Sequence, residues 1–284
     1  MKLIRFGEPG RESPGVLLED GTRVDASGFG ADYDEKFFAG DGLKELGSWV
    51  AGHPSAPRVG AAARLGPPVS RPSKIVCIGL NYHDHAAETK AESPKEPVIF
   101  FKASSSLVGP NDALVMPRNA TKVDWEVELA FVVGREARNV EKRDALDHVV
   151  GYVLHNDYSE RAFQIERGGQ WVKGKSADTF APLGPFLATR DEIPKPEHLD
   201  VWLKVNGALR QKSNTEQMIF GIAELLSYVS QFMTLLPGDV ISTGTPPGVA
   251  LGMDSPVYLK PGDTVTLGIE CLGESQQKVV AYRK

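Results

Sequence analysis

The sequence predicts an α+β fold in which β-strands predominate. Short apolar or alternating runs recur along the 284 residues, and turns containing Gly, Pro or Asp separate them. A single longer segment, residues 216–239, has the apolar spacing of an amphipathic helix. A chain of this length exceeds a typical single domain and has ample material for a hydrophobic core.

Residues 1–68 are predicted to form a small N-terminal α/β domain. The runs "KLIRF" and "GVLLEDGTRVDAS" alternate like strands around an Asp20-Gly21 turn, and a polar stretch that we expect to be helical follows. The proline-rich segment "LGPPVSRPSK", residues 65–74, indicates an extended connector. We therefore place the domain boundary between residues 68 and 69.

The second predicted domain, residues 69–284, carries most of the strand signals. The runs that predict strands are "KIVCIGL", "PVIFFKA", "DWEVELAFVVG", "HVVGYVLHNDYS", "VWLKVNG", "DVISTGT", "DTVTLGIECLG" and "KVVAYR". In the segment 216–239, apolar residues at positions 218, 219, 222, 225, 226 and 229 form a helical stripe, which we expect to end at Pro237.

Charge and composition exclude several classes of partner. The 37 acidic and 32 basic residues give a formal net charge of −5 without long runs of like charge, so neither nucleic acid nor an anionic membrane is expected as a partner. No run approaches the roughly 18 apolar residues of a membrane span, and "MKLIRFGEPG" lacks the pattern of a secretory signal. Cys77 and Cys271 have no metal or CxxC spacing and are predicted to be reduced core thiols. We expect a soluble, cytoplasmic protein.

Two acids lie in the strand-like run "DWEVELAFVV", residues 124–133. Because strand side chains alternate between faces, Glu126 and Glu128 share one face with Ala130 and Val132. Their Cα atoms would be about 7 Å apart, so two charged carboxylates there need water, a proton or a cation to offset their repulsion. A half-exposed strand with solvated acids is one interpretation, and a buried cation site is the other.

Asp157 is a third acid that can reach the same place. It ends the apolar run "VVGYVLHND", where a strand could deliver its carboxylate; the alternative is a helix cap before "YSERAFQIE". Three carboxylates without a nearby Cys, and without His at a zinc spacing, form a hard oxygen-ligand set. The set predicts Mg²⁺, with Mn²⁺ or Ca²⁺ as alternatives, rather than zinc.

The stretch "NYHDHAAE" holds a candidate general base. His85 and Glu88 are three residues apart and lie on one face if the segment is helical, which suits an imidazole oriented by a carboxylate. His83 faces elsewhere. An ordinary polar surface helix is the alternative interpretation of the same residues.

Two further segments could bind anions. "WVKGKSADTF" supplies Lys173 and Lys175, which could bind a carboxylate or transfer a proton, although solvated lysines are the alternative. "ISTGTPPGVALG" could present Thr245 and backbone N–H groups to an anion, or be a plain turn. It lacks the GxxxxGK[ST] spacing, so no nucleotide site is expected.

Together these segments resemble the fumarylacetoacetate hydrolase family over residues 70–283. The family's E-x-E … D metal triad matches Glu126, Glu128 and Asp157, and its active-site His and Glu match His85 and Glu88. The resemblance also implies site roles for five other residues in "FFKASSS", "DYSERAFQ", "KGKSADTF" and "GTPPG": Lys102, Arg161, Gln164, Lys175 and Thr245.

The resemblance implies a mixed β-sheet roll around a metal ion, usually in a homodimer. Mg²⁺ or a similar ion would hold a 2-oxo acid and stabilise the enolate formed when the C3–C4 bond of a 2,4-diketo acid breaks. His85, oriented by Glu88, would deprotonate the attacking water, and Lys175 would stabilise oxyanionic charge. Arg161 and Gln164, with Lys102 and Thr245, would contact the substrate. The products would be pyruvate and a carboxylic acid.

Within the family, "SERAFQIERGGQWVKGKSADTFAPLGP", residues 159–185, looks most like bacterial hydrolases of 2,4-diketo-3-deoxy sugar acids, such as those derived from L-fuconate or L-rhamnonate. Acylpyruvate hydrolases, oxaloacetate decarboxylases, hydratases and isomerases are related members. A protein that binds 2-oxo acids without turnover is an alternative of another class.

Overall fold

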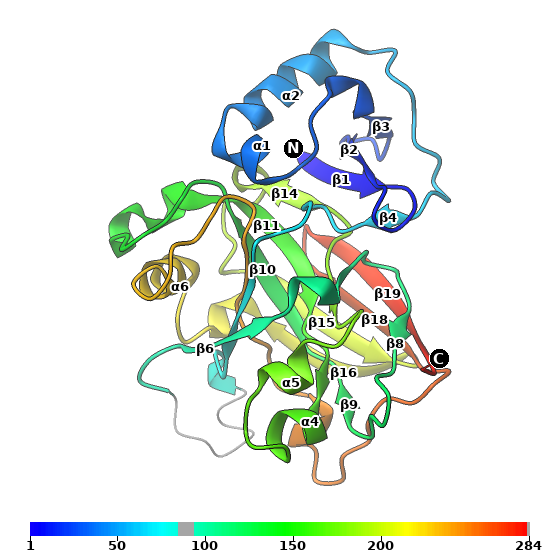
Figure 1. Ribbon diagram of the computed structural model, residues 1–284, viewed down its shortest axis with the longest axis vertical. Helices are drawn as coiled ribbons and strands as arrows, with labels where there is room; N and C mark the ends of the chain where they lie inside the picture. The colour runs from blue at the N-terminus through cyan, green and yellow to red at the C-terminus, as the bar shows by residue number, and fades with distance from the viewer. Residues whose placement is uncertain (85–93, 283–284) are drawn as a thin grey trace.

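The described residues form two main β-sheets and two two-stranded ones, with short helices around them (Figure 1). The structure is a computed structural model that describes residues 1–84 and 94–282. The larger sheet has ten strands in the order β3-β2-β1-β14-β11-β10-β17-β5-β6, with β4 paired to β1 off this path. The smaller has five strands in the order β16-β15-β18-β19-β8. The predicted α+β, strand-rich class is confirmed.

The N-terminal segment adds one end to the large sheet. Strands β1 (Lys2–Phe6), β2 (Ser13–Leu17) and β3 (Arg23–Asp25) are antiparallel, and Gly21 adopts φ +83° in the predicted turn between the last two. They are followed by η1 (Ser27–Phe29), α1 (Glu35–Ala39), α2 (Gly42–Gly52) and β4 (Leu65–Gly66). Because β1 also pairs with β14 (Leu187–Thr189), the two predicted domains share a sheet. Their division at residue 68 stays a prediction.

The middle of the large sheet positions the acids. Here lie β11 (Val149–Asn156), β10 (Val127–Val133), β17 (Val240–Ser242), β5 (Ile75–Gly79) and β6 (Val98–Lys102). The β17–β5 pair is parallel, whereas the other pairs along this stretch are antiparallel. The sheet is therefore mixed, as predicted.

The second sheet packs beside the first at the C-terminal end of the chain. It contains β16 (Ala208–Asn214), β15 (Asp200–Val205), β18 (Thr264–Ile269), β19 (Gly273–Val280) and β8 (Leu114–Val115). Two short ladders join β9 (Val123–Asp124) to β12 (Ser159–Glu160) and β7 (Leu107–Val108) to β13 (Ala181–Pro182). The remaining helical elements are η2 (Ser104–Ser106), η3 (Lys142–His148), α4 (Arg161–Ile165), α5 (Val172–Lys175), η4 (Arg190–Glu192), η5 (Thr215–Gln217), α6 (Ile222–Val229) and η6 (Ala250–Gly252).

Strand β10 is buried on both faces. Val127, Leu129, Phe131 and Val133 pack into one apolar cluster, together with residues of the second sheet and α6. The alternate residues Ala130 and Val132 belong to another cluster, which includes Phe37, Phe38 and Leu46 from the helices α1 and α2. The predicted alternation is present, but the face that the solvated-acid interpretation would expose to water is buried.

The helix predicted over residues 216–239 is much shorter. Helix α6 begins after Gly221, which is extended at φ −74° and ψ 169°, and ends at Val229 rather than at Pro237. Met218 forms a β-bridge with Tyr82, and the Ile219 N–H donates to the Asn81 carbonyl. These long-range contacts hold the first part of the stripe outside the helix. The second part of the predicted stripe is confirmed, because α6 buries Ile222, Leu225, Leu226 and Val229.

The two thiols have different surroundings. Cys77 is buried in β5, as predicted, whereas Cys271 is exposed in the turn between β18 and β19, so the prediction of a core thiol there is wrong. A turn residue at φ +62° projects from the sheet instead of packing into it. No helix in the described part of the chain is both long and apolar enough to cross a membrane.

Candidate functional site

The three predicted ligands converge in the interior. Oxygen atoms of Glu126, Glu128 and Asp157 all lie within 4.8 Å of one another, and at most 7 % of any of the three residues is exposed. The solvated-face interpretation is therefore wrong. Asp157 does not cap a helix either, because the Glu160 carboxylate accepts the hydrogen bond from the Phe163 N–H at the start of α4.

Strand pairing explains why the acids meet. Glu128 lies within β10 opposite His155, while Glu126 and Asp157 extend the same antiparallel ladder just beyond the ends of β10 and β11. The Glu126 N–H donates to the side-chain Oδ1 of Asn156, which fixes the chain as it enters β10. Cross-strand neighbours on one face lie about 5 Å apart, close enough for their carboxylates to share a cation.

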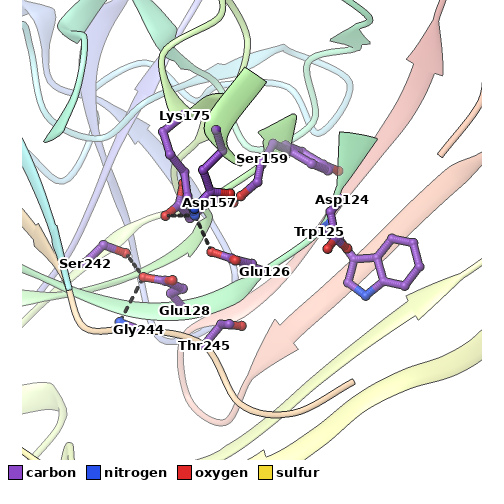
Figure 2. A network of polar contacts seen from close by, with 12 residues as sticks. Asp124, Trp125, Glu126, Glu128, Asp157, Ser159, Lys175, Ser242, Gly244 and Thr245 are labelled. Carbon is purple, nitrogen blue, oxygen red and sulfur yellow. Dashed lines mark hydrogen bonds and ion pairs between the residues drawn. The ribbon is translucent and has the colours of Figure 1, made fainter. Parts of the chain in front are cut away.

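Two buried lysines offset part of the negative charge, and Figure 2 shows one of them, Lys175. Lys175, at the end of α5, places its Nζ 2.6 Å from Glu126 Oε2 and 2.8 Å from Asp157 Oδ2. Lys102, at the end of β6, places its Nζ 2.5 Å from Asp157 Oδ1 and also donates to the Tyr158 carbonyl. Asp157 is therefore held between two ammonium groups.

Arg161 anchors the outer side of the site. Its Nε donates to Asp124 Oδ2 at 2.9 Å, one terminal nitrogen donates to Glu126 Oε1 at 2.7 Å, and the other donates to Gln164 Oε1 at 3.0 Å. Asp124 is itself buried and accepts the backbone N–H groups of Ala250 and Leu251. The guanidinium thus fixes Glu126 and Gln164 to one rigid support.

Glu128 has a different environment. Its Oε2 accepts hydrogen bonds from the Ser242 hydroxyl, at 2.5 Å, and from the Gly244 N–H, at 3.0 Å. Within residues 1–84 and 94–282, no lysine or arginine forms an ion pair with it. Burial, and then the negative charges of Asp157 and Glu126, raise the pKa of Glu128 well above its usual range.

The neighbouring groups keep their charges. Burial acts to raise the pKa of Asp157, but Lys102 and Lys175 outweigh it and lower that pKa below the usual range. For Lys175, the carboxylates of Asp157 and Glu126 outweigh burial and raise the pKa above its ordinary value. Burial also lowers the pKa of His155 to about 3, so its ring is neutral near pH 7.

The donor set fits a hard divalent cation. Four buried carboxylates, Asp124, Glu126, Glu128 and Asp157, face three buried cations, Lys102, Arg161 and Lys175, so the cluster keeps one formal negative charge. Glu128 is the acid without a cationic partner among the described residues, so its carboxylate is the one that a bound cation would neutralise. Carboxylate oxygens are the ligands preferred by Mg²⁺, Mn²⁺ and Ca²⁺, and the acidic triad suits such an ion.

A cavity of about 240 Å³ opens beside Glu126 and Glu128 of the triad. Its floor contains Glu126, Glu128, Lys175, Arg161 and Thr245, and Gln164 lies beside them. Its other described walls are mainly apolar and comprise Ile78, Gly79, Leu80, Phe100, Ile165, Trp171, Val249, Leu251 and Gly252. The cavity therefore joins a charged floor to an apolar rim.

The predicted site residues fall into three groups. Arg161, Gln164, Lys175 and Thr245 line the cavity with Glu126 and Glu128, whereas Asp157 is not among the described residues of its lining. Lys102 is not among the described residues of its lining, because its ammonium is turned to Asp157 and Tyr158. His85 and Glu88 lie outside the described residues. The role of each of these residues stays a prediction.

Several residues of the site were not predicted from the sequence. Asp124 was visible next to the acid pair, but nothing local showed that it would pair with Arg161. Trp171 walls the cavity because Gly79 allows its ring to approach, and a Cβ at Gly79 would lie 2.6 Å from that ring. Ser242 was part of a strand-like run and carried no signal of its own. Lys173, the other lysine of its segment, is exposed and donates to the Arg167 carbonyl.

The fold and the site define an enzyme-type cavity beside a buried acidic triad that suits a divalent metal. Residues 74–280 match the family model described as "Fumarylacetoacetate (FAA) hydrolase C-terminal". The chain belongs to the fumarylacetoacetate hydrolase family, as the sequence resemblance predicted.

Individual relatives cover the whole chain. It is 50 % identical over 284 residues, 100 % of each chain, to a Burkholderia multivorans protein whose name provisionally calls it a hydrolase. Maleylpyruvate hydrolase from Sphingobium sp. SYK-6, solved with a manganese(II) ion and pyruvate, is 32 % identical with a TM-score of 0.83 and full coverage of both chains. The 5-carboxymethyl-2-hydroxymuconate delta-isomerase from Mycobacterium smegmatis is 32 % identical with a TM-score of 0.77 and full coverage of both. None of these names mentions a sugar acid.

Proposed function

We propose that the protein is a metal-dependent hydrolase that cleaves the C3–C4 bond of a 2,4-diketo acid to give pyruvate and a carboxylic acid. The observation that carries this proposal is the buried acidic triad, in which three carboxylates lie beside the Lys175 ammonium and two of them, Glu126 and Glu128, line the cavity. A Sphingobium relative with manganese and pyruvate supports a 2-oxo acid as ligand.

Glu126, Glu128 and Asp157 would hold the cation, with Mg²⁺ as the first candidate and Mn²⁺ or Ca²⁺ as alternatives. When bound, such an ion supplies a fixed positive charge for the carboxylate and 2-oxo oxygens and for the negative charge that develops as the C3–C4 bond breaks. In the net reaction the oxygen of one water joins C4 and one of its protons ends on C3.

Lys175 is suited to stabilise charge rather than to act as a base. Its raised pKa keeps the ammonium protonated, and the ring of Phe100 lies 4.9 Å from Nζ on the cavity wall. A protonated donor fixed at the edge of the floor can hydrogen-bond to an oxyanion of the substrate as that charge forms.

Gln164 is positioned to bind the substrate. Since its Oε1 accepts from Arg161, its amide nitrogen is left to donate, and no hydrogen bond from that nitrogen occurs within the described part of the chain. Arg161 uses three of its five N–H donors on Asp124, Glu126 and Gln164, so we propose that it orients Glu126 and Gln164. Thr245 lies at the floor, where its hydroxyl donates to the Val127 carbonyl.

The water-activating step is assigned to His85 and Glu88 on the sequence resemblance. A His85→Ala variant should lower the rate of hydrolysis by about 10²–10⁴-fold, the contribution typical of a general base. Mn²⁺ affinity should stay within about 3-fold of wild type, a change of less than ~0.7 kcal/mol. Loss of metal binding in this variant would contradict the assignment.

For the acyl half of the substrate we propose a 2,4-diketo-3-deoxy sugar acid of the 6-deoxy kind, such as that derived from L-rhamnonate or L-fuconate. Residues 159–185 resemble hydrolases of such compounds, and the chain end of a 6-deoxy sugar acid is a methyl group. Ile165, Trp171 and Leu251 provide an apolar rim for that methyl. A simple alkyl acylpyruvate fits the same description.

We also propose that the protein is a cytoplasmic homodimer, as expected from the sequence and the family resemblance.

The test is pyruvate release from a panel of acylpyruvates and 2,4-diketo-3-deoxy sugar acids in the presence of Mg²⁺. We expect release that stops on chelation and returns with metal. Absence of release across the panel, with tight binding of oxalate or pyruvate, would favour the binding-protein alternative.

Oxaloacetate decarboxylation and isomerisation are the competing activities, and an isomerase is among the relatives. Both could use the same floor, but neither consumes water. Measuring CO₂ release and substrate isomerisation alongside hydrolysis separates the three reactions. If hydrolysis is the slowest of them by ten-fold or more, the proposal is wrong.

A further inference from the structure

The carboxylate of Glu128 is used asymmetrically. Both hydrogen bonds that it accepts, from the Ser242 hydroxyl and the Gly244 N–H, end on Oε2 (Figure 2). Its Oε1 accepts no hydrogen bond from any residue that the structure describes, although Glu128 lines the cavity. One oxygen is thus tied to the protein, and the other is left for a ligand.

A buried histidine, His155, contacts the Ser242 hydroxyl. His155 Nδ1 lies 2.7 Å from Ser242 Oγ, and only 1 % of His155 is exposed. A serine hydroxyl has one hydrogen, so when Ser242 donates to the Glu128 carboxylate, the Nδ1–H of His155 must donate to Ser242. The contacts then form a chain in which each group holds the next.

The other ring nitrogen shows what this contact costs. With the proton on Nδ1, Nε2 is an acceptor, and it is one of two buried side-chain atoms in the described residues without a hydrogen-bond partner. Leaving a buried acceptor without a hydrogen bond is unfavourable. An apolar side chain at position 155 would leave no unsatisfied acceptor. What such a side chain would lack is the hydrogen bond from Nδ1 to Ser242.

We propose that Ser242, held by His155, is a positioning residue that turns Oε2 of Glu128 into the protein and leaves Oε1 for the metal ion. The inference rests on the metal site of the proposed function. Groups behind a metal ligand commonly fix its orientation in this way, and their loss typically weakens metal affinity by about 10–100-fold.

The backbone makes the chain rigid. Strands β11, β10 and β17 are consecutive neighbours in the large sheet, with Glu128 opposite His155 and Ala130 opposite Ser242. Each of the three side chains therefore starts from a backbone position fixed by ladder hydrogen bonds. Without the Ser242 hydroxyl, Glu128 keeps only the Gly244 N–H and can rotate.

Thr243 provides a matched control. It is the next residue in the chain, it is equally buried, and its hydroxyl donates at 2.9 Å to the Leu129 carbonyl rather than to an acid. Thr243→Val removes one buried hydroxyl hydrogen bond and Ser242→Ala removes two, but only Ser242→Ala touches the proposed ligand. Ser242→Thr keeps the hydroxyl and serves as the conservative variant.

The experiment measures Mn²⁺ binding to metal-free protein by calorimetry, with thermal unfolding of each variant in parallel. We expect Ser242→Ala to weaken Mn²⁺ binding about 10–100-fold. Ser242→Thr and Thr243→Val should stay within about 3-fold of wild type, less than ~0.7 kcal/mol. The affinity loss should appear at temperatures where Ser242→Ala is fully folded.

A second comparison tests the role of His155. His155→Leu should weaken Mn²⁺ binding by itself but add no further loss to Ser242→Ala, because the histidine acts through the serine. Additive losses would contradict that link.

Wild-type affinity in Ser242→Ala, or an equal loss in Thr243→Val, would overturn the positioning role while leaving the proposed hydrolase intact. Binding of Mn²⁺ that depends on Ser242, without turnover of any 2,4-diketo acid, would overturn the proposed function alone. A wild-type protein that binds no Mn²⁺ would overturn both.

Discussion

The backbone N–H of Asp157 donates a 2.9 Å hydrogen bond to the carbonyl oxygen of Glu126. This bond continues the β10–β11 ladder by one step beyond the strands and brings two acids, 31 positions apart in the sequence, to one point. The fold thereby assembles like charges in its interior, where Lys175 bridges them. Several measurable properties follow from this arrangement.

Metal binding should stabilise the fold. A divalent cation relieves the repulsion among Glu126, Glu128 and Asp157 and binds only the folded chain, so Mg²⁺ or Mn²⁺ at 100 times its Kd should add about 2.7 kcal/mol to the free energy of unfolding. Differential scanning calorimetry with chelator, then with excess metal, measures this. An unchanged Tm on saturation with either metal would count against the site.

Glu128→Gln should separate stability from metal binding. The pKa of Glu128 is raised in the folded protein, so its stabilising contribution is complete below the pKa of the unfolded chain and is lost as the pH rises through the folded value. Glutamine cannot ionise. Without metal, we therefore expect the variant and wild type to be closest in stability at acidic pH and the variant to be the more stable one at higher pH.

The same substitution removes one ligand charge and should weaken Mn²⁺ affinity and activity strongly. Chemical denaturation from acidic to mildly alkaline pH gives the stability comparison, and calorimetry gives the affinity. Equal Mn²⁺ affinity in Glu128→Gln and wild type would show that Glu128 is not a metal ligand.

Lys175→Met should destabilise the metal-free protein. It leaves the carboxylates of Glu126 and Asp157 without their shared ammonium, and removing one partner of a buried ion pair typically costs about 3–5 kcal/mol. The matched control is Lys173→Met, because Lys173 is exposed two residues away; it should change stability by no more than about 0.5 kcal/mol.

Saturating Mn²⁺ should recover part of the stability lost in Lys175→Met, since the cation replaces the missing positive charge, whereas turnover should remain low. Urea titrations with and without metal measure both effects. A similar loss in the Lys173 and Lys175 variants would show that the buried contacts of Lys175 do not matter.

The apolar rim should set the preference for the acyl chain end. Leu251 lies on the cavity wall and is 42 % exposed, so Leu251→Ser should fold normally but lose apolar contact with the substrate. We expect kcat/KM for hexanoylpyruvate to fall about ten-fold relative to that for acetylpyruvate, since one or two methylenes in an apolar pocket are worth ~1–3 kcal/mol.

Val257→Ser is the control for this prediction, because Val257 is an exposed apolar residue that is not among the described residues lining the cavity. Steady-state kinetics on both substrates give the ratio. The same ratio in Leu251→Ser as in wild type would place the acyl chain elsewhere.

The sequence by itself determined the fold class, because short apolar runs between turns can bury their side chains only as strands in a sheet. It also marked Glu126, Glu128 and Asp157 as one ligand set. Carboxylates at the ends of apolar runs stand out against their surroundings, whereas a counter-ion such as Lys102 resembles any lysine at a strand end.

Long-range contacts decided the extent of local elements. Residues 216–239 have a continuous apolar stripe, yet the bridge from Met218 to Tyr82 and the extended Gly221 delay the helix until Ile222. The spacing of apolar residues shows which side chains could share one face of a helix. It does not show which neighbours compete for the backbone.

Only the tertiary structure decided what surrounds the acids. The Ser242 hydroxyl meets Glu128 across 114 positions of sequence, and it does so because β17 lies beside β10 in the sheet. Alternation along a strand fixes the face on which each side chain lies. What covers that face, whether water, a helix or a hydroxyl, depends on strand order, which is set by the packing energy of the whole chain rather than by any local pattern.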